Sequence, residues 1–204
     1  MLVPGDRHLA GKTGTRLKPQ YSWRGRWSLL FKYDTIIVKL KTKGGLALHE
    51  RPDWDRYFLE IAQVVAKRST CLRRCYGAVI VKDHIIISTG YNGAPRGENN
   101  CSDTGVCRRE ELRVPKGERY ELCVAVHAEQ NALINADPAG MKEATIYIAG
   151  FNQDGTIASG QPCLLCRRMI RNARLARVVY YAADGCIVTC RPEELLVEVT
   201  TRQG

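Results

Sequence analysis

The chain has 204 residues, of which 45% are hydrophobic and 25% charged, as in an ordinary globular protein with room for one sizeable core. Its net charge of +10 is concentrated at the start: residues 1–50 hold 10 Lys/Arg against 3 Asp/Glu, which leaves 21 against 18 for residues 51–204. The nearly neutral body argues against a nucleic-acid partner, and no apolar run approaches the ~20 residues of a membrane span.

Residues 1–50 are rich in Gly, Lys and Arg and have no helical period, with one candidate strand at 35–40. This composition predicts a basic, mobile N-terminal extension followed by a folded domain over 51–204. The opening residues lack the apolar segment of a secretory signal, so we expect a cytoplasmic protein. In a reducing compartment, nine cysteines are more typical of metal ligands or core residues than of disulfides.

Regular structure is predicted from Asp53 onward. Asp53 is a candidate N-cap, and apolar residues at helical spacing predict a helix that runs to about Ser69. Two β-rich runs at 76–81 and 84–89, separated by Lys82-Asp83, then predict a hairpin.

The segment 90–122 is loop-like, and a loop of this length in a compact domain is expected to be functional or tied down. After it, helices and strands alternate, which favours an α/β sandwich around a mixed sheet. The elements expected are a helix at 127–136, a strand at 144–149, a helix from 162 to about 173 and a strand at 176–181.

Two short motifs carry the chemistry. Cys163 and Cys166 follow Pro162, and we expect them on one face of the first turn of a helix, where the helix dipole favours thiolate. Alone, a Cys-x-x-Cys is equally typical of a redox pair or half of a structural zinc site. Joined to His127, it makes a three-ligand set that leaves one zinc position open for water. Glu129, two residues further on, is then expected to carry protons and not to bind the metal.

The His-x-Glu motif together with Pro-Cys-x-x-Cys resembles the zinc-dependent cytidine/deoxycytidylate deaminase superfamily. Residues from about 53 to 181 are similar to its deoxycytidylate branch, most specifically in the string Thr89-Gly-Tyr-Asn-Gly-Ala-Pro95. The resemblance implies a three-layer α/β/α cytidine-deaminase-like fold with a mixed central sheet, a homo-oligomer, and hydrolytic deamination of dCMP to dUMP. It also implies that Asn92 binds the nucleotide sugar, whereas Asn-Gly alone would favour an ordinary tight turn.

The same resemblance implies a second, structural zinc that would tie down the loop 90–122. Its four thiolate ligands would be Cys71, Cys101, Cys107 and Cys123. The remaining cysteines are expected to be buried and to behave as small apolar residues: Cys75, Cys186 and Cys190. The candidate phosphate partners are Arg73, Arg74 and Arg96.

Two segments depart from the family pattern. The long turn before Pro-Cys, at 148–160, is expected to reshape the pocket beside the metal. Asn135-Ala-Asp-Pro138 replaces the aromatic and basic residues that accompany regulation by nucleoside triphosphates, which argues against control by dCTP and dTTP. Two alternatives stay open: a tRNA or other nucleic-acid deaminase, and a non-catalytic zinc-binding module.

Overall fold

The computed structural model describes residues 50–115 and 117–196. The basic extension predicted for residues 1–50 and its candidate strand at 35–40 lie outside the described residues, apart from Glu50. Within the described ranges, no helix is long and apolar enough to cross a membrane.

Helix α1 (Trp54–Ala66) begins where the sequence predicts. Asp53 is its N-cap, because the carboxylate accepts a hydrogen bond of 2.8 Å from the backbone amide of Arg56. The helix ends before the predicted end at Ser69, since the amides of residues 67–69 bond to carbonyls three residues back, as in a tighter turn.

Strands β1 (Arg74–Lys82) and β2 (Ile85–Tyr91) form the predicted antiparallel hairpin. The turn consists of Asp83 and His84, with φ of 50° and 62°. A two-residue turn that is left-handed at both positions matches the twist of the flanking strands. The predicted turn at Lys82-Asp83 is therefore one residue too early.

The sheet is mixed, as predicted. Its strand order is β2-β1-β3-β5-β6, with β4 paired to β3 at the side. The pairing of β3 with β5 is parallel, and the other pairings are antiparallel. The strands not yet given are β3 (Thr145–Asn152), β4 (Ile157–Ala158), β5 (Arg177–Tyr181) and β6 (Ile187–Cys190).

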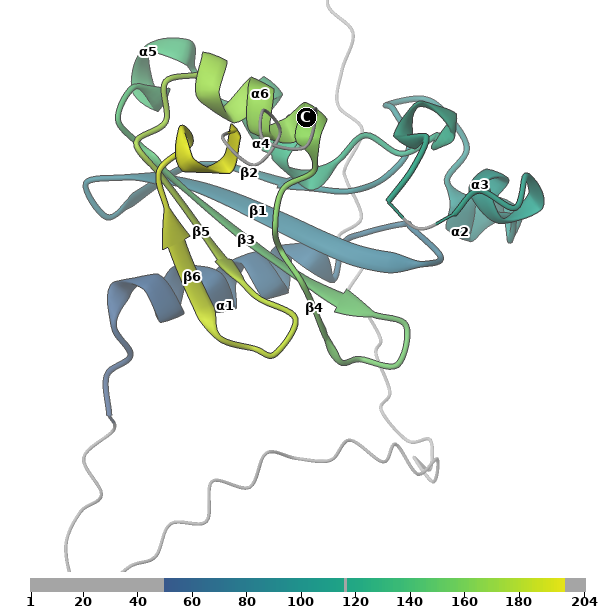
Figure 1. The fold of residues 1–204 in the computed structure, drawn as a ribbon, viewed down its shortest axis with the longest axis horizontal. Coiled ribbons are helices and arrows are strands. Elements are labelled where there is room, and N and C mark those ends of the chain that lie inside the picture. The colour runs from purple at the N-terminus through teal and green to yellow at the C-terminus, as the bar shows by residue number, and fades with distance from the viewer. Residues whose placement is uncertain (1–49, 116, 197–204) are drawn as a thin grey trace, which may run out of the picture. The chain divides into compact units, whose positions relative to one another are not determined.

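Helices cover both faces of the sheet, which confirms the predicted three-layer α/β/α fold (Figure 1). Alternate side chains of β1 point to opposite faces, so Val79 and Val81 pack under α1 while Ala78 and Ile80 pack under the helices of the other face. Those helices are α4 (Ala128–Asn135), α5 (Pro138–Met141) and α6 (Leu164–Asn172).

Two glycines allow the helices to approach the sheet closely. A Cβ at Gly77 would lie 2.2 Å from a carbonyl oxygen of α1, and one at Gly90 would lie 2.2 Å from the amide nitrogen of Ala132 in α4. Such contacts exclude any side chain at these positions. The Ser88 hydroxyl also donates to the Ala132 carbonyl at 2.6 Å. These contacts fix α4, and therefore the residue at its start, against β2.

The segment between β2 and α4 is more regular than the predicted loop over 90–122. It contains α2 (Cys101–Thr104), α3 (Arg108–Glu111) and the 3-10 turn η1 (Tyr120–Leu122). Gly93 and Val126 form an antiparallel bridge across its ends, and the Ser102 amide donates to the Thr70 carbonyl at 3.1 Å. Helices of three or four residues show no apolar period, so periodicity does not predict them.

Candidate metal centre and active site

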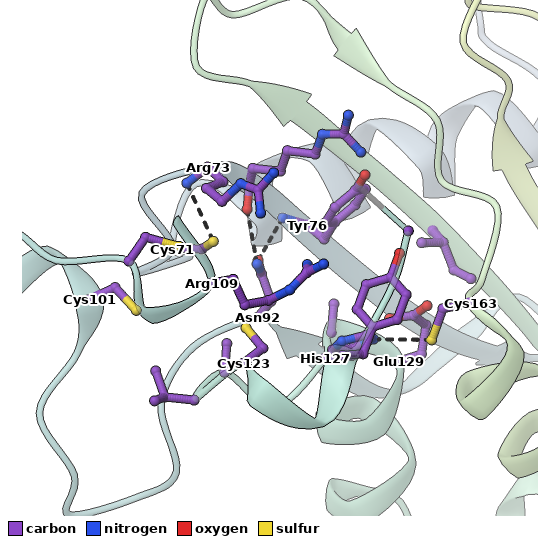
Figure 2. Close-up of a pocket in the computed structure, with 18 of the residues that line it drawn as sticks. Cys71, Arg73, Tyr76, Asn92, Cys101, Arg109, Cys123, His127, Glu129 and Cys163 are labelled. Carbon is purple, nitrogen blue, oxygen red and sulfur yellow. Dashed lines mark hydrogen bonds between the residues drawn. The ribbon is translucent and has the colours of Figure 1, made fainter. Parts of the chain in front are cut away.

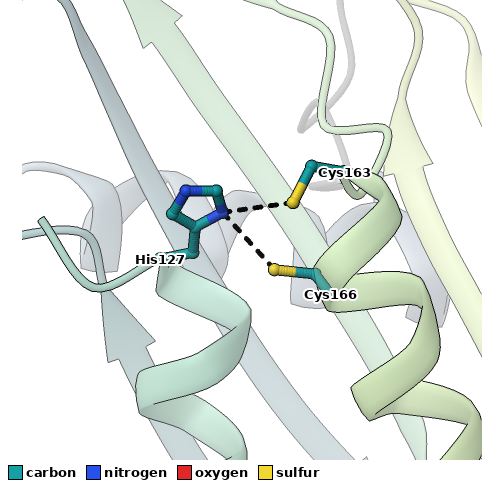
Figure 3. Close-up of side chains that lie close together, drawn as sticks. All are labelled: His127, Cys163 and Cys166. Atoms are coloured by element: carbon teal, nitrogen blue, oxygen red, sulfur yellow. Dashed lines mark hydrogen bonds between the residues drawn. The ribbon is translucent and has the colours of Figure 1, made fainter. Parts of the chain in front are cut away.

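The starts of two helices bring His127, Cys163 and Cys166 together (Figure 3). His127 is the N-cap of α4, Cys163 is the N-cap of α6, and Cys166 lies buried in the first turn of α6. The Nδ1 atom of His127 lies 3.4 Å from the Sγ atoms of both cysteines. Because α6 begins at Leu164, Pro162 precedes the N-cap and does not occupy the first turn as predicted.

These three atoms fit a tetrahedral zinc ion. Zinc binds thiolate sulfur at about 2.3 Å and imidazole nitrogen at about 2.0–2.1 Å, which places nitrogen and sulfur about 3.6 Å apart. The observed separations of 3.4 Å are close to that value. Two thiolates and one imidazole leave one tetrahedral position for water or substrate, so the predicted three-ligand set has the composition of a catalytic site.

The ionisation of the three side chains is coupled. The hydrogen bond from Cys166 is the main cause that lowers the pKa of Cys163 to about 4, although burial opposes it. The pKa of Cys166 is raised, because its thiol donates that bond and is buried. The hydrogen bond with Cys163 raises the pKa of His127, while burial and the charge of Arg109 act in the opposite direction. The two sulfurs thus share one negative charge and one proton. A bound metal ion would displace that proton.

Glu129 lies beside the three candidate ligands and is not part of their group. It is the second residue of α4 and is 6% exposed. Burial is the main cause that raises its pKa, and the nearby charge of His127 opposes the shift. Its carboxyl is also hydrogen-bonded to Cys166. A buried carboxyl with a raised pKa holds a proton more readily than an exposed one, which suits it to proton transfer.

One pocket joins this cluster to the four cysteines predicted for a second zinc (Figure 2). We call its two regions the metal end, lined by His127, Glu129 and Cys163 with the buried Cys166 beside them, and the cysteine end, lined by Cys71, Cys101, Cys107 and Cys123. The lining of the pocket also includes Tyr76, Asn92, Tyr120 and Ile148.

Asn92 lies in the wall of this pocket and is 7% exposed. Its Oδ1 accepts a hydrogen bond of 2.7 Å from the Tyr76 amide, and its Nδ2 donates to the Arg74 carbonyl at 2.9 Å. These bonds fix the loop after β2 against the start of β1, a structural role that sequence reasoning did not assign. The side-chain amide of Asn92 retains one N–H donor and one acceptor position. The predicted contact with a sugar hydroxyl would use these positions and stays a prediction.

The cysteine end brings the four predicted thiols to one part of the pocket. Burial is the main cause that raises the pKa of Cys101, followed by the charges of Cys71, Cys123 and Cys107. Among the residues that the structure describes, however, the cluster at the metal end is the one group whose ligand atoms all lie within 4.8 Å of one another. The Cys71 sulfur accepts a bond of 3.5 Å from the Arg73 amide instead. A second zinc therefore stays a prediction.

The other cysteines differ from the expected buried state. Cys75 in β1 and Cys190 in β6 are half-buried, and Cys186 is exposed. The expectation of a buried apolar role is wrong for Cys186, because its amide donates to Asp184 Oδ1 in the turn between β5 and β6 and its thiol faces outward.

The predicted arginines divide into two groups. Arg73 and Arg74 line the pocket, whereas Arg96 donates to the Asn135 side chain at 2.9 Å. Sequence reasoning missed Arg109 and Tyr120, which also line the pocket. Nothing in the local sequence separates Arg109 from the charged residues around it in α3, since its burial arises from tertiary packing.

The long turn before Pro162 extends the sheet. β3 and β4 pair through Gly150 with Ala158 and Phe151 with Ile157. The first and last residues of this segment, Ile148 and Gly160, line the pocket together with the following Gln161. The segment therefore contributes to the pocket at its two ends.

A three-layer α/β fold with a His-Cys-Cys cluster and a buried glutamate at two helix starts defines a zinc-binding hydrolase class. Residues 52–182 match the family described as "Cytidine and deoxycytidylate deaminase zinc-binding region", and the chain belongs to that family.

Two curated relatives agree with this assignment. The deoxycytidylate deaminase of Mycobacterium phage D29 is 43% identical over 134 residues, which cover 64% of this chain and 95% of the phage protein. The deoxycytidylate deaminase of Schizosaccharomyces pombe is 37% identical over 65% of this chain and 38% of its own length. A crystal structure of dCMP deaminase from the cyanophage S-TIM5 with dCMP and dUMP aligns with a TM-score of 0.45 and 23% identity, over 74% of this chain and 95% of that one.

Proposed function

We propose that the chain catalyses the hydrolytic deamination of dCMP to dUMP. The observation that carries the proposal is the approach of His127 Nδ1 to the sulfurs of Cys163 and Cys166 beside a buried Glu129. The relatives named deoxycytidylate deaminase support the substrate, and the phage relative aligns over 95% of its length. In this proposal the two cysteines and His127 hold the catalytic zinc.

The proposed chemistry assigns the proton transfers to Glu129. A bound zinc ion would lower the pKa of a neighbouring water. The Glu129 carboxylate takes a proton from the water whose oxygen bonds to C4 of cytosine. It gives this proton to ring nitrogen N3, then takes the remaining proton from the oxygen now bound to C4 and gives it to the amine. The C4–N bond breaks as the C4=O bond of uracil forms, and ammonia is released. The buried position of Glu129 raises its pKa toward the range that this exchange requires.

The rest of the pocket suits a small nucleotide. Ala125, Ala128 and Ile148 offer apolar surface to a base, and Asn92 would bind the sugar. Four arginines line the same pocket and offer positive charge to a phosphate: Arg73, Arg74, Arg108 and Arg109. A homo-oligomeric state and a cytoplasmic location remain further predictions of this proposal.

The test is ammonia release from a panel of dCMP, CMP, deoxycytidine, dCTP and free cytosine. We expect the highest kcat/KM with dCMP. Equal values for all five compounds, or none for dCMP, would refute the substrate, and inactivity toward every cytosine compound would favour a non-catalytic zinc module. Glu129→Gln keeps the size of the side chain and should lower kcat about 10²–10⁴-fold with zinc retained. A fully active Glu129→Gln protein would refute the mechanism.

A further inference from the structure

Arg109 carries a buried positive charge for which the described chain supplies no acid. Its side chain belongs to α3, and the residue is 7% exposed. Nη2 donates to the carbonyls of Pro115, at 2.9 Å, and Glu118. Within residues 50–115 and 117–196 no carboxylate pairs with the guanidinium, and Nε is buried without a hydrogen-bond partner. Buried arginines are normally paired, because an uncompensated charge in a protein interior is costly.

The guanidinium lies in the wall of the active-site pocket. Its central carbon lies 4.9 Å from the centre of the Tyr120 ring, and that ring meets the His127 ring edge-on at 5.4 Å. In Figure 2 the Arg109 side chain extends into the pocket between Asn92 and His127. The Tyr120 ring thus lies between the Arg109 guanidinium and His127 of the cluster. In a nucleotide, the sugar lies between the base and the phosphate. The spacing therefore suits a nucleotide whose base lies at the cluster and whose phosphate lies at Arg109.

The other arginines of the pocket differ from Arg109. Arg73 pairs with Glu110 at 3.2 Å, and Arg74 and Arg108 are exposed. An exposed guanidinium is solvated and its charge is screened, whereas a buried one gains most from a bound anion. Arg109 is therefore the pocket arginine whose environment is most incomplete without an anionic ligand.

We propose that Arg109 binds the 5′-phosphate of the substrate and so selects a nucleotide over the corresponding nucleoside. Stacking on Tyr120 and the two carbonyl bonds hold the guanidinium in place, which leaves Nε and Nη1 as donors to phosphate oxygens. The inference rests on the proposed deaminase function and adds to it the residue that recognises the phosphate.

The experiment compares kcat/KM for dCMP and for deoxycytidine, using the full-length zinc-loaded protein. The variants are Arg109→Met and a matched control, Arg113→Met, which removes an exposed arginine four residues further along the chain. We expect Arg109→Met to lower kcat/KM for dCMP about 30-fold or more while changing deoxycytidine less than about threefold. Arg113→Met should leave both substrates unchanged.

Three outcomes would overturn the assignment while leaving the deaminase function standing. The wild-type protein could have the same kcat/KM for dCMP and deoxycytidine. Arg109→Met could lower kcat/KM equally for both substrates, or it could leave both values unchanged. Absence of wild-type activity toward either substrate would instead refute the proposed function itself. Zinc content and circular dichroism report whether each variant is folded. If Arg109→Met does not fold, Arg109→Lys replaces it, because lysine keeps a positive charge above Tyr120. A loss of kcat/KM confined to dCMP then supports phosphate binding, and an equal loss for both substrates overturns it.

Discussion

The metal end and the cysteine end of the pocket are built in different ways. At the metal end, His127 and Cys163 cap helices that pack on the sheet, and α4 is anchored to β2 through the Ser88 hydroxyl and the space left by Gly90. At the cysteine end, Cys101 begins α2, Cys107 caps the start of α3 and Cys123 follows η1, and none of these helices is longer than four residues. The side chains of the metal end are therefore held by elements that pack on the sheet, and those of the cysteine end by very short helices.

The two regions also differ in their buried polar atoms that lack a hydrogen-bond partner. In the part of the chain that the structure describes, the buried side-chain atoms without a partner are Thr70 Oγ1 and Arg109 Nε. Thr70 precedes Cys71, and Arg109 lies two residues after Cys107, so both belong to the chain segments that carry the four cysteines. At the metal end the protein groups already bond to one another. The segments that carry the four cysteines thus hold buried polar atoms without a partner, whereas the protein groups of the metal end are bonded to one another.

The largest effect is expected from removal of a ligand at the metal end. Cys166→Ala removes a buried sulfur from the cluster, so we expect loss of the catalytic zinc and a fall of about 10³-fold or more in kcat. Since α6 packs on the sheet, circular dichroism should change little. Cys186→Ser, which alters an exposed thiol between β5 and β6, is the control and should retain zinc and activity. Global unfolding of Cys166→Ala would show that the metal end also depends on its metal.

The next largest effect is expected at the cysteine end. If four thiolates bind a second zinc there, elemental analysis of the wild-type protein should give two zinc ions per chain, and Cys101→Ser should give one. Loss of a structural metal should lower the free energy of unfolding by about 4 kcal/mol or more. Cys75→Ser, in β1, serves as the control. A wild-type content near one zinc, unchanged in Cys101→Ser, would contradict the second site.

A smaller effect should follow from a change in the scaffold that supports the metal end. A Cβ at Gly90 would lie 2.2 Å from the Ala132 amide nitrogen, so Gly90→Ala must push α4 away from β2. We expect a loss of about 1–3 kcal/mol in the free energy of unfolding, together with weaker zinc retention. Gly140→Ala is the matched control, because its Cβ would meet its nearest neighbour at 3.8 Å. Equal effects of the two substitutions would contradict the close-packing argument.

The contrast between long and short elements also explains which parts of the fold the sequence predicted. The helix after Asp53, the hairpin and the helices that carry His127 and Cys166 have local signals in the form of caps, turns and apolar periods. β4 has two residues and β6 has four. Each pairs with the strand immediately before it in the chain, but both are too short to show a clear alternating pattern of apolar residues.

The side chains of the pocket follow the same division. His127, Cys163 and Cys166 could be grouped from two short motifs, and the structure places them together. The motif spacing is local and reflects the coordination chemistry of zinc. Arg109 could not be selected, because the burial and missing ion-pair partner that distinguish it exist only after the segment between β2 and α4 has folded.

The smallest expected effect lies on the opposite face of the sheet, away from the pocket. The Tyr147 hydroxyl donates to Asp55 Oδ1 at 2.9 Å, and Asp55 also pairs with Arg177 at 2.8 Å. Tyr147→Phe should lower the free energy of unfolding by about 1 kcal/mol at neutral pH without changing zinc content or kcat. A change in kcat would show that the α1 face is coupled to the metal end.

The same hydroxyl also gives a pH dependence. Burial is the main cause that raises the pKa of Tyr147, and the hydrogen bond to Asp55 adds to it. The neutral phenol is therefore favoured in the folded state. Its stabilisation is fully present below the unfolded pKa of about 10 and is lost as the pH rises from there toward the folded value. Denaturant titrations should show the wild-type protein losing stability above that pH more steeply than Tyr147→Phe. Parallel pH profiles would mean that the phenol ionises equally easily in both states.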